Sequence, residues 1–132
     1  MTTFVFNNFV YDVESDFRYP LQSFSFKSFR KNDFHGVCFH FAQWAKSVVL
    51  VWSEYKNIDI QCYIFDVILT SKDRHSYNYF ICNGDTYVVD FTAANNAYIN
   101  SQSYQHLIMN IGDADMYDYS KNVYKDKVYN VY

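Results

Sequence analysis

Apolar side chains recur every three or four residues over 36–55, a spacing that predicts an amphipathic helix. Asp33, just upstream, can cap this helix or act as a first-turn anion, and Gly36 allows a sharp turn into it. The β-branched run 48–52 is also typical of a strand, so the pattern leaves the end of the helix open. The apolar positions are Val37, Phe41, Trp44, Ala45, Val48, Val49 and Trp52.

The Asn83-Gly84 pair is a strong signal for a two-residue hairpin turn, because both central residues of a type I′ turn need a positive φ. If these residues form the turn, Tyr77 faces Asp90 across the two strands. His75 then shares a face with Asp90 and lies diagonally across from it, within reach of its side chain. A loop of odd length would place them on opposite faces.

The remaining segments predict mostly strands and loops around the helix and the hairpin. Odd- and even-numbered positions of 58–69 are both mainly apolar, which predicts a central strand covered on both sides. One helix with several strands indicates an α+β fold. The other expectations are a strand or extended segment at 4–13, a strand or loop at 23–29, a loop at 93–103, a short helix or strand at 104–111, and a strand pair or partly ordered tail at 118–132.

Composition limits the classes of protein that the chain can belong to. Its 132 residues suit one domain, 1–132, and a single Pro and three Gly leave little room for a linker. A net charge of −3 without a basic run argues against nucleic-acid binding. The sequence carries no signal-peptide pattern and no apolar run long enough for a membrane span. The odd number of cysteines favours free thiols in a reducing compartment such as the cytoplasm.

The predicted helix begins close to Cys38, which suggests a reactive cysteine. Free N–H groups and the macrodipole at a helix N-terminus stabilise a thiolate, and a nearby histidine can complete a thiolate–imidazolium pair. A carboxylate on the other ring nitrogen fixes the orientation of the imidazole. Cys38, His75 and Asp90 are therefore the candidate catalytic residues. The backbone N–H of Cys38 can serve in an oxyanion hole, and the Asn32 side chain is a second candidate donor.

These residues resemble the Cys-His-Asp core of the papain-like and transglutaminase-like superfamily. The resemblance rests on Gly36-Val37-Cys38 at the helix entry, His75 opening one strand and residues 87–92, Tyr-Val-Val-Asp-Phe-Thr, closing the next. Residues 89–93, Val-Asp-Phe-Thr-Ala, look most like the bacterial toxin and effector branch, and the spacing is also similar to that of arylamine N-acetyltransferases. The resemblance implies a cysteine-bearing N-terminal helix packed on an antiparallel sheet.

The resemblance further implies an acyl-enzyme mechanism on an amide, with Cys38 as nucleophile, His75 as general base and acid, and Asp90 as orienting residue. The expected activity is glutamine deamidation or proteolysis, without a cofactor or metal. The expected partner is a glutamine-bearing host or competitor protein, reached in the cytoplasm or after delivery into a target cell. A transglutaminase or acyltransferase using the same triad, and a non-catalytic binding module or inhibitor, remain open.

Other residues have simpler interpretations. His35 is a rival base without a carboxylate partner at a recognisable spacing, His40 suits a helix face pointing away from Cys38, and His106 suits the surface. A zinc site would need Cys38 and His40 together with the other two cysteines, but no Cys-x-x-Cys pair supports it. The acidic cluster at 113–118 lacks the glycine and glutamate of a calcium loop and indicates a solvated turn.

Overall fold

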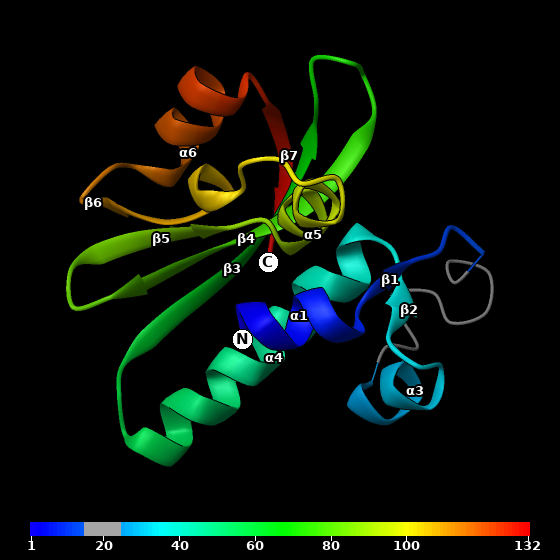
Figure 1. The fold of residues 1–132 in the computed structure, drawn as a ribbon. Helices are drawn as coiled ribbons and strands as arrows, with labels where there is room; N and C mark the ends of the chain where they lie inside the picture. Colours follow the sequence, from blue (N-terminus) through cyan, green and yellow to red (C-terminus); the bar gives the residue numbers. More distant parts are fainter. Residues whose placement is uncertain (15–24) are drawn as a thin grey trace.

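A five-stranded antiparallel sheet lies at the centre of the structure, with its strands in the order β6-β5-β4-β3-β7 (Figure 1). The structure is a computed structural model and describes residues 1–14 and 25–132. Helices accompany the sheet, so the predicted α+β class is confirmed. The strands of the sheet are β3 (Ile60–Ile68), β4 (Arg74–Cys82), β5 (Asp85–Val89), β6 (Ile108–Gly112) and β7 (Lys127–Val131).

The two faces of the sheet bury separate hydrophobic clusters. Helices α1 (Thr2–Asn8), α3 (Phe26–Lys31), α4 (Cys38–Lys56) and α5 (Phe91–Ile99) contribute to the first cluster, which also takes Phe80 and Val89 from the sheet. The second cluster is built around Phe65, Tyr77 and Tyr79, and α6 (Met116–Tyr119) and the π-helical turn η3 (Ser120–Tyr124) pack against it. Figure 1 shows α4 and α6 on opposite sides of the sheet.

The helix predicted at 36–55 is α4, and it carries Cys38 as its first residue. The run 48–52 continues the helix, which ends at Asn57 in a left-handed cap with φ 53°. Asn78 on β4 is buried and donates to the Ala42 carbonyl of α4 at 3.0 Å, which ties the helix to the sheet. Helices α1 and α3 precede α4, so the cysteine does not lie on the first helix of the chain as predicted.

The strand or extended segment predicted at 4–13 is mostly wrong. Residues 2–8 form α1, and only β1 (Val10–Tyr11) is a strand, paired in parallel with β2 (His35–Gly36). The aromatic and β-branched residues that favoured a strand pack instead on the aromatic cluster over α4. Phe4, for example, stacks on Trp44 with ring centroids 5.6 Å apart. Packing against a large apolar surface outweighs the intrinsic preference of these residues for a strand.

Three further segments differ from their predictions. Residues 25–29 begin a helix, because Ser25 caps α3 in a reciprocal pair with Ser28; residues 23 and 24 lie outside the described residues. The predicted loop at 93–103 mostly belongs to α5. Residues 118–132 contain the single strand β7, preceded by the end of α6 and by η3, rather than a strand pair.

Two other predicted features agree with the structure. The central strand at 58–69 is β3, which lies between β4 and β7. Residues 104–111 contain both alternatives, the 3₁₀ turn η2 (Gln105–Leu107) followed by β6. Among the described residues, no helix combines the length and the apolar character that crossing a membrane requires.

Gly36 is needed for close packing next to Cys38. A Cβ at this position would lie 2.8 Å from the His40 Cβ, closer than side chains tolerate. We expect Gly36→Ala to lower the free energy of unfolding by about 1–3 kcal/mol, because α4 must shift to relieve the overlap. Urea unfolding measures this change. Gln102→Ala, at an exposed position, is the control, and an equal unfolding midpoint for both variants would contradict the prediction.

Candidate active site

Cys38 occupies the first position of α4, where the backbone N–H groups have no partner within the helix. Val37 is the N-cap, and its N–H donates to the His40 Nδ1 at 2.9 Å. Asp33 therefore does not cap the helix; it lies in the preceding turn with φ 53°. His40 is fully buried beneath the first turn of the helix, while Cys38 is partly exposed.

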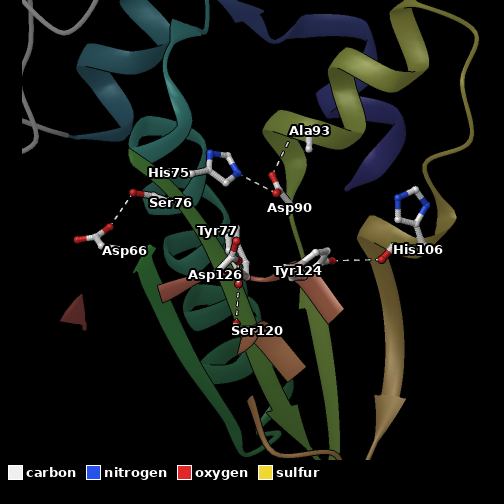
Figure 2. A network of polar contacts seen from close by, with 10 residues as sticks. All are labelled: Asp66, His75, Ser76, Tyr77, Asp90, Ala93, His106, Ser120, Tyr124 and Asp126. Atoms are coloured by element: carbon white, nitrogen blue, oxygen red, sulfur yellow. Dashed lines mark hydrogen bonds and ion pairs between the residues drawn. The ribbon is translucent and has the colours of Figure 1, made fainter. Parts of the chain in front are cut away.

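The hairpin brings His75 and Asp90 together in the predicted register. Asn83 and Gly84 form the turn with φ values of 52° and 81°, and the pairing runs from Cys82 opposite Asp85 to Asn78 opposite Val89. The His75 Nε2 lies 2.8 Å from the Asp90 Oδ2. Figure 2 shows the two side chains pointing toward one another from the start of β4 and the end of β5.

Asp90 also holds the start of α5. Its Oδ1 accepts the Ala93 N–H at 3.0 Å, while its Oδ2 faces His75 (Figure 2). One carboxylate thus caps a helix and orients an imidazole. The aspartate followed by Phe-Thr-Ala-Ala was an available signal for this helix, but the sequence prediction used Asp90 only as the partner of His75.

The third contact joins His75 to Cys38. Burial lowers the pKa of His75, but the Asp90 carboxylate and the hydrogen bond with the Cys38 side chain outweigh it and raise that pKa to about 10. His75 is therefore an imidazolium at neutral pH. The structure thus joins His75 to Asp90 by a hydrogen bond, and Cys38, at the start of α4, contributes to the raised pKa of the same imidazole.

The other cysteines have different surroundings. All three thiols are free. Burial raises the pKa of Cys62, on β3, to about 11, although Lys46 opposes the shift. Cys82 lies at the end of β4, next to the hairpin turn. Cys38 therefore differs from both in combining a helix N-terminus with a histidine contact.

Asn32, the second candidate for an oxyanion donor, caps the C-terminus of α3. Its side-chain Nδ2 is buried and has no hydrogen-bond partner among the residues that the structure describes. No contact between Asn32 and Cys38 is found in that part of the chain. A role for Asn32 in the site stays a prediction.

The remaining histidines take structural positions. His35 has a carboxylate partner after all, since its Nδ1 lies 3.3 Å from the Asp12 Oδ2, just beyond β1. His40 packs inside the start of α4, and His106 is exposed, as predicted. The His106 carbonyl accepts the Tyr124 hydroxyl at 3.2 Å.

The candidate metal sites of the sequence do not assemble. Within residues 1–14 and 25–132, no group of three or more His, Cys, Asp or Glu side chains is placed to hold a metal ion. In the acidic cluster, Asp115 caps α6 by accepting the N–H groups of Tyr117 and Asp118. The cluster therefore starts a helix, where a carboxylate is favourable.

A cavity of about 510 Å³ borders the site, and the sequence analysis did not find it. His75 and Asp90 form part of its wall, together with Tyr77, Tyr124 and Asp126. The Tyr77 hydroxyl donates to the Asp126 Oδ2 at 2.8 Å and lies 2.6 Å from the Ser120 Oγ (Figure 2). The local sequence around Asp126 gives no sign that this residue lines the cavity. Its contact with Tyr77 depends on how the chain folds back after α6.

Comparisons of this chain with known protein families, with curated proteins and with solved structures find no match. The chemistry of the site has therefore to be inferred from its own residues. The connected side chains of Cys38, His75 and Asp90 are the strongest starting point.

The two roles of Asp90 can be separated by substitution. Asparagine caps helices about as well as aspartate but has no charge, so Asp90→Asn is expected to keep α5 and to lower the pKa of His75 well below 10. Asp90→Ala is expected to lower that pKa as well and to cost about 1 kcal/mol more stability, because the cap is also lost. NMR titration of the His75 ring and urea unfolding measure the two effects.

The same pair makes stability depend on pH. The folded-state pKa of His75 is raised from 6.5 to about 10, so its contribution is fully present below pH 6.5 and disappears as the pH rises to about 10. The stability difference between wild type and Asp90→Asn should shrink over this interval. A difference that stays constant or grows would show that the ion pair does not raise the pKa of His75.

Proposed function

We propose that this protein is a cysteine-dependent amide hydrolase that acts on protein substrates through an acyl-enzyme. The observation that carries the proposal is the connected series of Cys38 at a helix start, the His75 imidazolium and the buried Asp90 carboxylate. It is the arrangement that an activated thiol nucleophile requires. The proposal includes the resemblance to papain-like and transglutaminase-like proteins, most of all to their toxin and effector branch.

Each of the three residues has a distinct role in the reaction. The Cys38 thiolate attacks the amide carbon, and His75 gives its proton to the departing nitrogen as the carbon–nitrogen bond breaks. A water molecule then loses a proton to His75 and attacks the thioester, and the carboxylic acid and thiolate are released. Asp90 keeps the imidazole oriented through both steps.

The N-terminus of α4 supplies the electrostatic environment for this reaction. The first-turn N–H groups are directed along the helix axis and favour negative charge, both on the thiolate and on the oxygen of the tetrahedral intermediate. The Cys38 N–H is the donor we propose for that oxygen. Asn32 is a further proposed donor to that oxygen, because its Nδ2 has no hydrogen-bond partner among the described residues.

The surroundings of Cys38 favour a substrate of protein size. Tyr129 on β7 is 47% exposed and lies under Arg74, whose Cζ is 5.7 Å from the ring centroid. Burial raises the pKa of Tyr129, with Asp66 and Cys38 adding to the shift and Arg74 opposing it. An exposed aromatic and cationic surface suits a polypeptide better than a small enclosed ligand.

The activated pair can be tested by alkylation. Wild-type protein is treated with iodoacetamide between pH 5 and pH 9, and mass spectrometry locates the label. We expect Cys38 to react faster than Cys62 or Cys82 and to keep this excess well below pH 8, because the His75 imidazolium stabilises its thiolate. The excess should disappear in His75→Ala. The same ordinary thiol behaviour in both proteins would remove the catalytic proposal and favour a binding module on this fold.

Turnover is tested with glutamine-bearing proteins as substrates, using mass spectrometry of the intact products. A deamidase releases ammonia and leaves the substrate at full length, a protease shortens it, and a transglutaminase attaches an amine. Any of these activities should fall by about 10³-fold or more in Cys38→Ala and His75→Ala, as expected for residues that act as one unit. Cys82→Ala is the matched control, and an equal loss in that variant would refute the assignment.

A further inference from the structure

The cavity that borders His75 connects the surface of the protein with its interior. Its volume of about 510 Å³ lies within the range of about 300–1,000 Å³ that is typical of ligand sites. Two of its lining residues, Tyr11 and Ile99, are 54% and 66% exposed, whereas Tyr77 on the same wall is only 2% exposed. A ligand that enters past Tyr11 and Ile99 therefore leaves water and meets buried side chains.

The tyrosine hydroxyls of the inner wall bond within the protein. The Tyr77 hydroxyl donates to the Asp126 Oδ2 at 2.8 Å, and the Tyr124 hydroxyl donates to the His106 carbonyl at 3.2 Å (Figure 2). A hydroxyl has a single proton to donate. Neither tyrosine therefore has a donor left for a ligand, and what both offer to the cavity is aromatic surface.

The ionic and amide groups of the wall are engaged in the same way. The His75 Nε2 lies 2.8 Å from the Asp90 Oδ2, and the Asn95 Nδ2 donates to the Phe9 carbonyl at 3.2 Å. The Oδ1 atoms of Asn95 and Asp126 have no partner among the described residues, but both are enclosed by the protein. These two oxygens therefore do not open into the cavity.

The charges around the cavity do not favour a charged ligand. His75 and Asp90 form an ion pair, and none of the described residues that line the cavity is a lysine or arginine. Asp126 is the remaining acidic group, which disfavours an anion. A cation would lose its hydration without reaching an open acceptor that lacks a partner. The other polar side chains, Thr92 and Asn96, are half-buried and exposed, so they can bond to water near the surface.

The surface that remains for a ligand is mainly carbon. Leu69, Ile99 and Leu107 contribute aliphatic side chains, and Tyr77 and Tyr124 contribute aromatic rings. Transfer of apolar surface from water to such a wall is favourable, whereas transfer of a polar group without a partner is costly. The cavity therefore matches a ligand that is uncharged and apolar.

We propose that this cavity binds an uncharged aliphatic or aromatic group, held against Leu69, Leu107 and the ring of Tyr124. A leucine or phenylalanine side chain of the protein substrate and a free apolar molecule share this chemistry. His75 belongs both to the cavity wall and to the proposed catalytic residues, so an apolar side chain close to the reacting amide suits the position of the cavity. This role as a specificity pocket rests on the proposed function, whereas the class of ligand does not.

The probe for this proposal is ethylbenzene, and its control ligands are benzyl alcohol and benzylamine. The three molecules have nearly the same shape and differ only in a terminal methyl, hydroxyl or ammonium group. Binding is followed by NMR titration. We expect ethylbenzene to bind at least about tenfold more tightly than either control, because the hydroxyl or ammonium would be buried without a partner. Equal binding of the three ligands, tighter binding of a control, or no binding of ethylbenzene would overturn the proposal.

Substitutions locate the bound probe. Ala93 lines the cavity from α5, and Ala93→Leu should weaken ethylbenzene binding about tenfold because the new side chain occupies the space of the ligand. Ile99→Trp narrows the cavity from an exposed position, so it tests the site even if Ala93→Leu fails to fold. Leu50→Trp on α4, exposed at 45%, is its matched control. Unchanged binding in Ile99→Trp would place the probe elsewhere and refute the site.

Two further comparisons identify the source of the apolar group and separate the two proposals. An acetylated, amidated peptide with leucine next to glutamine is compared with its asparagine counterpart, which has a similar shape. A leucine preference that Ile99→Trp removes supports a substrate side chain, and binding of ethylbenzene alone supports a free ligand and refutes the specificity role. Cys38→Ser should abolish turnover and leave ethylbenzene binding unchanged. Turnover without ethylbenzene binding refutes the cavity alone, whereas binding that Ile99→Trp weakens, without turnover, refutes the function alone.

Discussion

The ion pair between His75 and Asp90 is the interaction on which the site depends. Its two members come from adjacent strands, and the carboxylate also begins α5. A charge buried at this depth is stable only when paired and hydrogen-bonded, and each oxygen of Asp90 has a donor. The geometry of the hairpin, the start of the helix and the protonation of His75 are therefore coupled through one side chain.

His75 and Asp90 both border the cavity. The Arg74 guanidinium lies over the ring of Tyr129 on the edge strand β7. The cavity is bounded in part by α5 and by the chain leading from η3 to β7. The imidazole contacts the thiol and also forms part of the cavity wall.

The hairpin register and the start of α4 were predictable from the sequence, whereas several of the elements around them were not. The Asn83-Gly84 turn sets a register by local geometry, and that register determines which face His75 and Asp90 share. The periodicity of α4 likewise placed Cys38 at a helix start. The helix α1 was not predicted, because its Phe and Val residues favour a strand until they meet the aromatic surface over Trp44. Asn95 and Asp126 had no local signal, since only long-range contacts bring them to one cavity.

Among the residues that the structure describes, the Asn95 Oδ1 and the Asp126 Oδ1 are buried without a hydrogen-bond partner. Each buried acceptor without a donor costs about 1–3 kcal/mol, a large share of the stability of a small domain. Apolar side chains of similar shape at these positions would remove that cost and fill the space. Asp126 instead keeps a carboxyl group whose pKa burial raises, and its Oδ2 accepts the Tyr77 hydroxyl at 2.8 Å.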